Sequence, residues 1–467
     1  MQTSRRSMGD GGPSIKKTKG AAAVDKKVPT RKIIYEQDPS YKFSETSVEK
    51  STEPLAYYPA NFLRTHSKNN DPADVQTQIW QCVFEPDPED LGSYTDIVAT
   101  CGGSSVCFIK TDTGEVILKY NRNTKSAAVV DNLYALVWSS VPLDDIGIKR
   151  INIVATAGGK STVLLMHPEA GVCYAMFRTV PNKAAATVCS LLFHPKKATW
   201  LFCGHEDGHI QLWDVGTPRP KKYEVNPVHL ITIPQVARDA YNLAFSQMNN
   251  LLIAGCDGGL HAWKMDMDKI EKKERLERME FILPNSVKLG AVVDTITLLR
   301  DDILAIKCAL HAKIYLIKLS TLVKEAKQKR STGLEISVTE KMMVKLRWSE
   351  TDNYYMNMGH DSKSCILVCG DDKGTLWVYD LLAYVTGSIQ SPITDGPVLN
   401  KDVEPALMLE WPELQDDEVE KARKLRLDTY DIVVDNCSVS PGGRHIVAVT
   451  SNNMVCIWKR GVDEDDE

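Results

Sequence analysis

Short apolar runs alternate with Gly, Asp and Asn turns along most of this chain, a pattern that predicts strands rather than helices. The clearest copy is HEDGHIQLWDV at 205–215, in which a tight turn leads into a strand ending in Trp-Asp. Weaker copies lie at 256–266, 371–381 and 450–460. One copy cannot bury its apolar face alone, so the copies should stack around an axis. The pattern predicts an all-β fold, a β-propeller, a class used more for recognition than for catalysis.

Seven copies of a three-strand unit can be counted from Trp80 onward, which predicts seven blades. The third strand of each unit carries a large apolar residue, in order Ile109, Met166, Trp213, Trp263, Ile317, Tyr379 and Trp458. The first strand of the sixth blade is placed at 344–348, VKLRW. The run Phe62–His66 is expected to supply the outer strand of the seventh blade, because closing the ring with strands from both ends removes two sheet edges.

The repeats are spaced more widely than the ~40–45 residues usual in propellers, so the excess is assigned to insertions. Three stand out, at 266–290, 320–341 and 382–430. The first contains DKIEKKERLERME, whose alternating charges indicate a solvated helix. The third contains PELQDDEVEKARKLRL, which begins at Pro412 and is expected to form another helix.

Both ends of the chain differ in composition from its middle. Residues 1–55 lack hydrophobic periodicity and are predicted to be a disordered basic arm, followed by the propeller at 56–460 and an acidic tail at 461–467. The candidate basic residues of the arm are Lys16, Lys17, Lys19, Lys26, Lys27, Arg31 and Lys32. Such an arm suits nuclear import or salt-dependent, non-specific DNA contact. A solvated tail without a partner is an equally good interpretation.

The overall composition adds limits on the class of protein. The 467 residues are 43% hydrophobic and 25% charged, with a net charge of −5, as in an ordinary soluble chain. The twelve cysteines show no disulfide-framework spacing, and most stand inside apolar strands. No signal peptide and no bilayer-spanning apolar run occurs, so we expect no membrane association and a reducing compartment, cytosol or nucleus.

The sequence lacks the common catalytic and phosphate-binding motifs GxxxxGK(S/T), GxSxG and HExxH. His205 and His209 flank the turn of the best-preserved repeat. Two histidines without a third ligand make a poor metal site, and a hairpin with exposed histidines is the expected arrangement. We therefore predict a non-enzymatic protein without metal, cofactor or small-molecule substrate.

One group of aromatic residues suggests a binding site. Trp80, Tyr134 and Tyr241 each open an innermost strand at the same offset. Each stands four residues before another aromatic residue, in order Phe84, Trp138 and Phe245. Aromatic rings at one mouth of the channel can form a cage for a methylated ammonium through cation–π attraction. The alternative is that the rings simply plug the channel or cover neighbouring loops.

Several runs of the chain resemble a known family. FLRTHSKNNDPADVQTQIWQCVFEP at 62–86 and VATCGGSSVCFI at 98–109 are similar to the propeller of leucine-rich repeat and WD repeat-containing protein 1, a family also called origin recognition complex-associated. The resemblance covers about 54–460 and includes the repeats ending at Asp214, Leu381 and Arg460. The chain departs from the family in one respect, because no LxxLxLxxN pattern precedes Phe62.

The resemblance implies a nuclear, chromatin-associated scaffold. Members of the family associate with origin recognition complex subunits and bind repressive trimethyl-lysine marks on histone H3 and H4 tails. They thereby support the origin complex on heterochromatin and the initiation of replication. Because the leucine-rich repeat pattern is absent, partner binding through the propeller is the expectation carried over to this chain.

A second resemblance concerns the cage itself. The Polycomb WD-repeat reader of methyl-lysine also begins its first two blades with aromatic residues, and Trp80 and Tyr134 match these positions. Its later aromatic pair is expected near Val344 and Lys345, where this chain has none. Tyr241 or a loop residue such as Tyr354 is the expected substitute.

Other readings of the sequence remain open at this point. The chain is also compatible with a generic WD-repeat scaffold, such as a ubiquitin-ligase adaptor, or with a Polycomb-like histone-mark reader. An active site in the channel would need convergent carboxylates or histidines, which the strand-entry positions do not show. Specific DNA readout is not expected, because the basic arm has no interleaved aromatic residues or recognition helix.

Overall fold

The computed structural model describes residues 47–51, 54–71, 73–90, 92–122, 131–143, 149–180, 186–234, 238–290, 292–328, 334–410 and 432–461. All elements below belong to one compact unit, 36–467. The basic residues expected at 16–32, the helix expected at 412–427 and the acidic residues after 461 lie outside the described residues.

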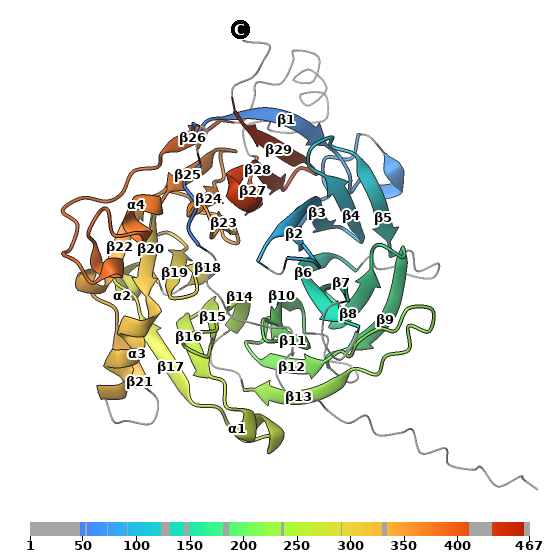
Figure 1. Ribbon diagram of the computed structural model, residues 1–467, viewed down its shortest axis with the longest axis horizontal. Helices are drawn as coiled ribbons and strands as arrows, with labels where there is room; N and C mark the ends of the chain where they lie inside the picture. Colours follow the sequence, from blue (N-terminus) through green and yellow to red (C-terminus); the bar gives the residue numbers. More distant parts are fainter. Residues whose placement is uncertain are drawn as a thin grey trace, which may run out of the picture. The chain divides into compact units, whose positions relative to one another are not determined.

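Seven sheets stand around a central axis as the blades of a propeller, which confirms the predicted fold class (Figure 1). Within a blade, neighbouring strands pair antiparallel, except for β17 and β21 of blade four, and the first strand is innermost. Blade one consists of β2 (Ile79–Pro86), β3 (Tyr94–Gly102), β4 (Ser105–Lys110) and β5 (Val116–Asn121). Blade two consists of β6 (Leu133–Pro142), β7 (Arg150–Gly158), β8 (Thr162–His167) and β9 (Val172–Arg178). Blade three consists of β10 (Val188–His194), β11 (Lys197–His205), β12 (Ile210–Asp214) and β13 (Val228–Ile233).

The other four blades follow the same order. Blade four consists of β14 (Arg238–Ser246), β15 (Leu251–Asp257), β16 (Gly259–Lys264), β17 (Arg278–Ile282) and β21 (Leu334–Ser337). Blade five consists of β18 (Val293–Arg300), β19 (Ile303–Cys308), β20 (Lys313–Lys318) and β22 (Met343–Arg347). Blade six consists of β23 (Gly359–Asp361), β24 (Ile366–Gly370), β25 (Leu376–Asp380) and β26 (Leu407–Leu409). Blade seven consists of β27 (Val434–Val439), β28 (His445–Thr450), β29 (Val455–Arg460) and β1 (Tyr57–Leu63).

The seventh blade is closed by β1, which pairs antiparallel with β29 from the other end of the chain (Figure 1). This strand begins earlier than the expected run at 62–66 and overlaps it only at residues 62 and 63. His66 instead lies buried against blade one, where its ring nitrogens bond to Thr100 Oγ1 and Ser105 Oγ, both at 2.8 Å. Burial lowers the pKa of His66 to about 3, so the ring stays neutral near pH 7.

The expected first strand of blade six is wrong. The run at 344–348 falls on β22, which pairs antiparallel with β20 as the outer strand of blade five. Blade six begins with β23 at Gly359. The alternating apolar pattern misled the prediction because an outer strand that packs on a neighbouring segment shows the same period-two burial as an inner one.

The first and third insertions supply outer strands. Between 266 and 290, the helix expected over DKIEKKERLERME is only the short α1 (Met267–Glu271), and the remainder leads into β17. Asp266 is the N-cap of α1, and its side chain accepts hydrogen bonds from the backbone N–H groups of Asp268 and Lys269. The described part of the third insertion contains α4 (Leu382–Val385), the 3-10 turn η3 (Pro392–Thr394) and β26.

The second insertion extends blade four. Here α3 (Leu319–Gln328) leads to β21, which pairs parallel with β17 as a fifth strand. Buried apolar side chains from blades four and five form one core cluster that also takes in Leu322, Ala326 and Ile336 from this insertion. The insertion therefore covers an outer sheet edge with the chain's own residues.

Candidate binding site at the channel rim

The innermost strands of six blades carry a β-bulge within their first four residues. The residue in the bulge is Trp80, Tyr134, Cys189, Tyr241, Asp294 and Asp435 in blades one, two, three, four, five and seven, respectively. A bulge leaves one residue unpaired and turns its side chain away from the regular pleat. The three predicted aromatic residues therefore occupy equivalent positions around one mouth of the channel.

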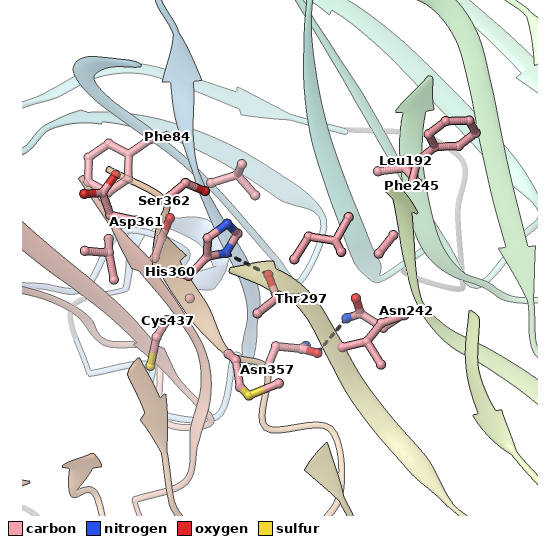
Figure 2. A pocket seen from close by; sticks show the side chains of 18 of the residues that line it. Phe84, Leu192, Asn242, Phe245, Thr297, Asn357, His360, Asp361, Ser362 and Cys437 are labelled. Carbon is pink, nitrogen blue, oxygen red and sulfur yellow. Dashed lines mark hydrogen bonds between the residues drawn. The ribbon is translucent and has the colours of Figure 1, made fainter. Parts of the chain in front are cut away.

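The residues that follow three of these bulges line one cavity of about 510 Å³ (Figure 2). Gln81, Asn242 and Asn436 contribute from blades one, four and seven, and Asn357 joins them just before blade six. Asn242 Nδ2 donates to Asn357 Oδ1 at 2.9 Å, which links blade four to blade six across the top of blade five. The cavity begins with amide side chains at this end, which we call the rim end.

Further along the cavity, the lining changes to apolar rings and then to charged residues. Phe84, Phe193 and Phe245 stand beyond the amides, and Tyr94 and Lys363 lie at the opposite mouth. The pairing of β2 with β3 fixes this direction, because Ile79 faces Gly102 at one end and Pro86 faces Tyr94 at the other. His360 bonds through Nδ1 to Thr297 Oγ1 at 2.7 Å, and burial lowers its pKa to about 4 (Figure 2).

Trp80 and Tyr134 lie together at the rim. Their ring centroids are 5.2 Å apart and their planes meet at 82°, an edge-to-face pair. Both side chains are half-buried, so part of each ring still faces solvent. The Gln81 side chain accepts the backbone N–H of Leu136 at 2.6 Å, which ties the two strands together just behind the pair. The structure thus brings two of the three predicted site residues into contact.

Tyr241 makes a different contact. Its ring lies 4.9 Å from that of Tyr355 at 70°, and its hydroxyl donates to Asp239 Oδ2 at 3.2 Å. The ring centroid of Tyr355 in turn lies 6.2 Å from that of Tyr354. Tyr355 is 42% exposed and Tyr354 is 40% exposed. Among the ring contacts of the described residues, none joins Tyr241 to Trp80 or Tyr134. The rim therefore carries two aromatic pairs, one on blades one and two and one between blades four and six.

Tyr355 is the rim residue that the sequence prediction missed. It stands two residues before Asn357, which forms a parallel bridge with Asn436, the residue after the blade-seven bulge. Because 344–348 belongs to blade five, Val344 and Lys345 do not stand at the entry to blade six, and the residues that precede β23 there include Tyr354 and Tyr355. The signal available was the Tyr354–Tyr355 dipeptide, but the strand that follows it, β23, reads Gly-His-Asp and has no apolar pattern to mark the start of a blade.

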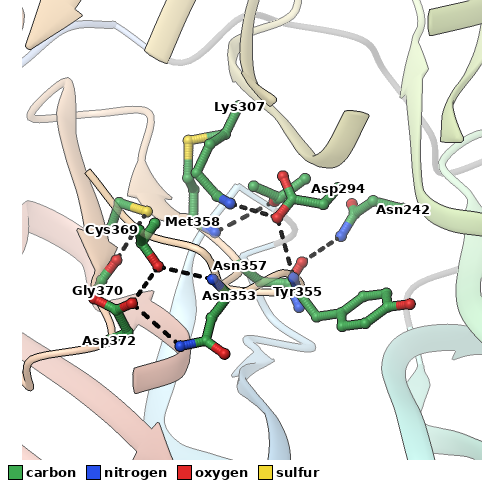
Figure 3. Close-up of polar contacts among 12 residues, drawn as sticks. Asn242, Asp294, Lys307, Asn353, Tyr355, Asn357, Met358, Cys369, Gly370 and Asp372 are labelled. Atoms are coloured by element: carbon green, nitrogen blue, oxygen red, sulfur yellow. Dashed lines mark hydrogen bonds and ion pairs between the residues drawn. The ribbon is translucent and has the colours of Figure 1, made fainter. Parts of the chain in front are cut away.

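The carboxylates of blades five and seven replace aromatic residues at the bulge. Asp435 is 2% exposed and accepts from Gln78 Nε2 at 2.8 Å. Burial raises its pKa to about 8, and the bond from Gln78 opposes this rise. Asp294 is 1% exposed and pairs with Lys307 (Figure 3). The Lys307 ammonium also lies 4.8 Å over the ring of Trp348.

Acidic side chains gather beside the second aromatic pair. Asp239 accepts from the Tyr241 hydroxyl, and the Asp239 N–H donates to the Glu206 carbonyl at 2.9 Å, so both acidic residues lie next to Tyr241. Burial raises the pKa of the nearby Cys189 thiol, and the negative charges of Asp239, Glu206 and Asp207 raise it further. Asp239 also contributes to the raised pKa of the Tyr241 hydroxyl, after burial and the neighbouring Tyr355. A mouth with aromatic faces and nearby negative charge attracts cations rather than anions.

The histidines of the best-preserved repeat do not form the exposed hairpin that was expected. His205 is fully buried, and its ring stacks on His209 with centroids 4.1 Å apart. Burial lowers the pKa of His205 to about 3, and the neighbouring His209 adds to this lowering. Within the described part of the chain, no group of three or more His, Cys, Asp or Glu side chains is arranged to hold a metal ion. None of its helices is long and apolar enough to cross a membrane.

A seven-bladed ring with these repeats and an open rim defines a WD-repeat scaffold protein. The chain belongs to the leucine-rich repeat and WD repeat-containing protein 1 family, whose WD-domain model matches residues 50–461. It is 30% identical over 409 residues to the Xenopus laevis member, covering 86% of this chain and 52% of that protein. It is 31% identical over 407 residues to the Homo sapiens member, covering 86% and 58%. The chain thus spans little more than half the length of these relatives.

Solved structures with a similar fold come from a different assembly. A chain of the Chaetomium thermophilum polycomb repressive complex 2 superimposes with a TM-score of 0.59 at 14% identity, covering 88% of this chain and 99% of that one. A chain from an active polycomb repressive complex 2 in the basal state gives a TM-score of 0.58 at 13% identity, covering 87% and 98%. At such low identity, the likeness concerns the fold alone.

Proposed function

We propose that this protein is a non-enzymatic chromatin scaffold whose rim binds trimethylated lysine on histone H3 or H4 tails. The observation that carries the proposal is the edge-to-face pair of Trp80 and Tyr134 at the open mouth of the channel. Tyr355, supported by Tyr241, offers a further aromatic face at the same mouth. A trimethylammonium has no N–H to donate, so aromatic faces are the groups that best replace its hydration.

The charges around the rim suit a histone tail. Each aromatic face contributes about 0.5–2 kcal/mol to binding of a cation, so several faces are needed for useful affinity. Tails rich in Lys and Arg would gain further attraction from carboxylates such as Asp239 and Glu206 beside Tyr241. This attraction acts mainly on the rate of association and weakens with salt.

We also propose that the propeller associates with origin recognition complex subunits in the nucleus and supports origin complexes on heterochromatin and the initiation of replication. Family membership is the support for this part. The basic residues at 16–32, which lie outside the described residues, are proposed to serve nuclear import or non-specific DNA contact. Affinity purification from nuclear extract tests the partner, and the absence of origin recognition subunits would contradict it.

The cage is tested by alanine substitution at Trp80, Tyr134 and Tyr355 of the full chain, with titration of trimethyl-lysine and unmodified H3 and H4 peptides. Each substitution is expected to weaken trimethyl-lysine binding by about tenfold or more while Tm falls by only a few degrees. Tyr94→Ala is the matched control, because Tyr94 is a 46% exposed aromatic residue at the opposite mouth of the same channel. Unchanged binding in the three rim variants, or an equal loss in Tyr94→Ala, would contradict the assignment.

A further inference from the structure

A buried ion pair lies directly beneath Tyr355. Asp294 occupies the bulge of blade five, the position that carries an aromatic residue in blades one, two and four. Its Oδ2 lies 2.5 Å from Lys307 Nζ, and both side chains are completely excluded from solvent. The same Oδ2 accepts the backbone N–H of Tyr355 at 3.0 Å (Figure 3). One carboxylate oxygen therefore joins the core of blade five to the rim loop.

The ion pair is poorly explained by stability alone. Removing two charges from water costs as much as their attraction returns in many proteins, and apolar residues of similar size often serve as well. Lys307 is further accommodated by the face of Trp348, at 4.8 Å. Asp294 Oδ1 has no hydrogen-bond partner among the described residues. What the pair adds over an apolar filling is a charged acceptor aimed at the Tyr355 amide, and such bonds are stronger than neutral ones.

The backbone of Tyr355 needs such an anchor. Its φ is +68°, a left-handed conformation that is uncommon for a bulky residue and costs free energy unless surrounding contacts hold it. The loop is held upstream by Asp372, whose Oδ2 accepts from Thr351 Oγ1 at 2.5 Å and Asn353 Nδ2 at 3.1 Å. Downstream, the Asn357 N–H donates to the Asp435 carbonyl at 2.8 Å. Between these ends, the bond to Asp294 holds the backbone of Tyr355, while its ring packs on Tyr241.

We infer that Asp294 and Lys307 are positioning residues that hold Tyr355 at the rim and so complete the cation-binding mouth. Lys307 pairs with the buried Asp294 carboxylate and holds it in place, and Asp294 holds the Tyr355 amide in its left-handed conformation. The ring of Tyr355 is thereby kept against Tyr241, where it faces the cation. The binding part of this inference rests on the proposed function, whereas the conformational part does not.

The test uses two paired variants of the full chain. Asp294→Leu/Lys307→Met removes the charges together with the acceptor, and Asp294→Asn/Lys307→Met removes the charges but leaves an amide oxygen for the Tyr355 N–H. Single variants are avoided because a lone buried charge destabilises the fold. Lys313→Met/Asp402→Leu is the control, since this partly exposed ion pair at 2.8 Å joins β20 of blade five to the third insertion rather than to Tyr355.

Hydrogen exchange of the segment around Tyr355 is the first measurement. We expect exchange at residues 351–357 to accelerate by about tenfold or more in the Leu/Met variant, with the strands of blade five unchanged, and to recover in the Asn/Met variant. Equal exchange in both variants, or no acceleration in either, would overturn the positioning role. This result decides the inference even if the wild-type chain binds no trimethyl-lysine peptide, an outcome that would overturn the proposed function separately.

Binding in a double-mutant cycle is the second measurement. The Leu/Met variant should bind a trimethyl-lysine H3 or H4 peptide about tenfold more weakly, and adding Tyr355→Ala to it should cause no further loss. Adding Trp80→Ala should still weaken binding. Full affinity in the Leu/Met variant, or a Tyr355→Ala effect as large as in wild type, would contradict the inference.

Discussion

The ring of Trp80 meets the ring of Tyr134 edge to face at 5.2 Å, so two successive blades present one aromatic corner to the channel mouth. Both residues occupy the same bulge near the start of their inner strands. The bulge is what turns their side chains to the rim rather than into the blade. The contact therefore depends on a repeated irregularity of the backbone as well as on the residue types.

We predict that Trp80→Phe retains most of the affinity for a trimethyl-lysine peptide, whereas Trp80→Leu loses about tenfold. Phenylalanine keeps a smaller aromatic face, and leucine keeps apolar area without a π-system. Titration of the two variants side by side measures the difference. Equal affinity of the two variants would show that the corner acts only as an apolar surface.

We predict that Tyr241→Phe leaves peptide affinity within about twofold of wild type and that Tyr241→Ala weakens it by about fivefold. The phenylalanine variant loses the hydroxyl bond to Asp239 but keeps the ring against Tyr355. The alanine variant removes the support behind Tyr355. If both variants lose affinity equally, the hydroxyl rather than the ring is the important group.

The stability of the propeller should depend on pH through Asp435. Burial raises its pKa from 3.8 to about 8 in the fold, so folding favours the protonated form. The stability that this group contributes is complete below pH 3.8 and is lost as the pH rises through about 8. Asp435→Asn, which stays neutral, should therefore raise Tm relative to wild type more at about pH 9 than at about pH 5.

Thermal unfolding at the two pH values checks the Asp435 prediction. Asp352→Asn is the control, because Asp352 is an exposed aspartate near the same rim. A Tm difference between Asp435→Asn and wild type that is the same at both pH values would show that Asp435 does not titrate as described.

Ring closure should depend on Asn453. This residue is fully buried, accepts the His66 N–H at 3.2 Å, and donates to Ser67 Oγ at 3.0 Å and the Asp74 carbonyl at 2.7 Å. Asn453→Ala should lower the free energy of unfolding by about 2–4 kcal/mol, because it leaves buried polar groups unpaired. Urea unfolding measures this loss of unfolding free energy, with Asn121→Ala, at an exposed position, as the control. A loss below about 0.5 kcal/mol in Asn453→Ala would contradict the prediction.

The fold was predictable because the repeat pattern sets the order of strands. The innermost strand of blade one and the pairing of both chain ends follow from apolar runs and turns around Trp80 and Trp458. The outer strands were less predictable, since they pack on one side only and lie within long connections. For this reason β17 was read as part of a helix and β22 as the start of a blade.

The site was predictable only in part. An equal offset placed Trp80, Tyr134 and Tyr241 at one mouth, but it could not show that Tyr241 pairs with Tyr355 instead of joining the other two. That contact depends on the left-handed backbone of Tyr355 and on its bond to Asp294, which come from tertiary structure. The burial of His205 was likewise invisible in a turn of polar residues.

The most direct test of the central claim compares two peptides that differ only in charge. One carries trimethyl-lysine and the other its uncharged carbon analogue, in which a tert-butyl group replaces the trimethylammonium. If the rim formed by Trp80, Tyr134 and Tyr355 binds through cation–π attraction, calorimetric titration of the wild-type chain will give about tenfold or greater preference for the charged peptide. Equal affinity for both peptides, or no binding of either, would contradict the account.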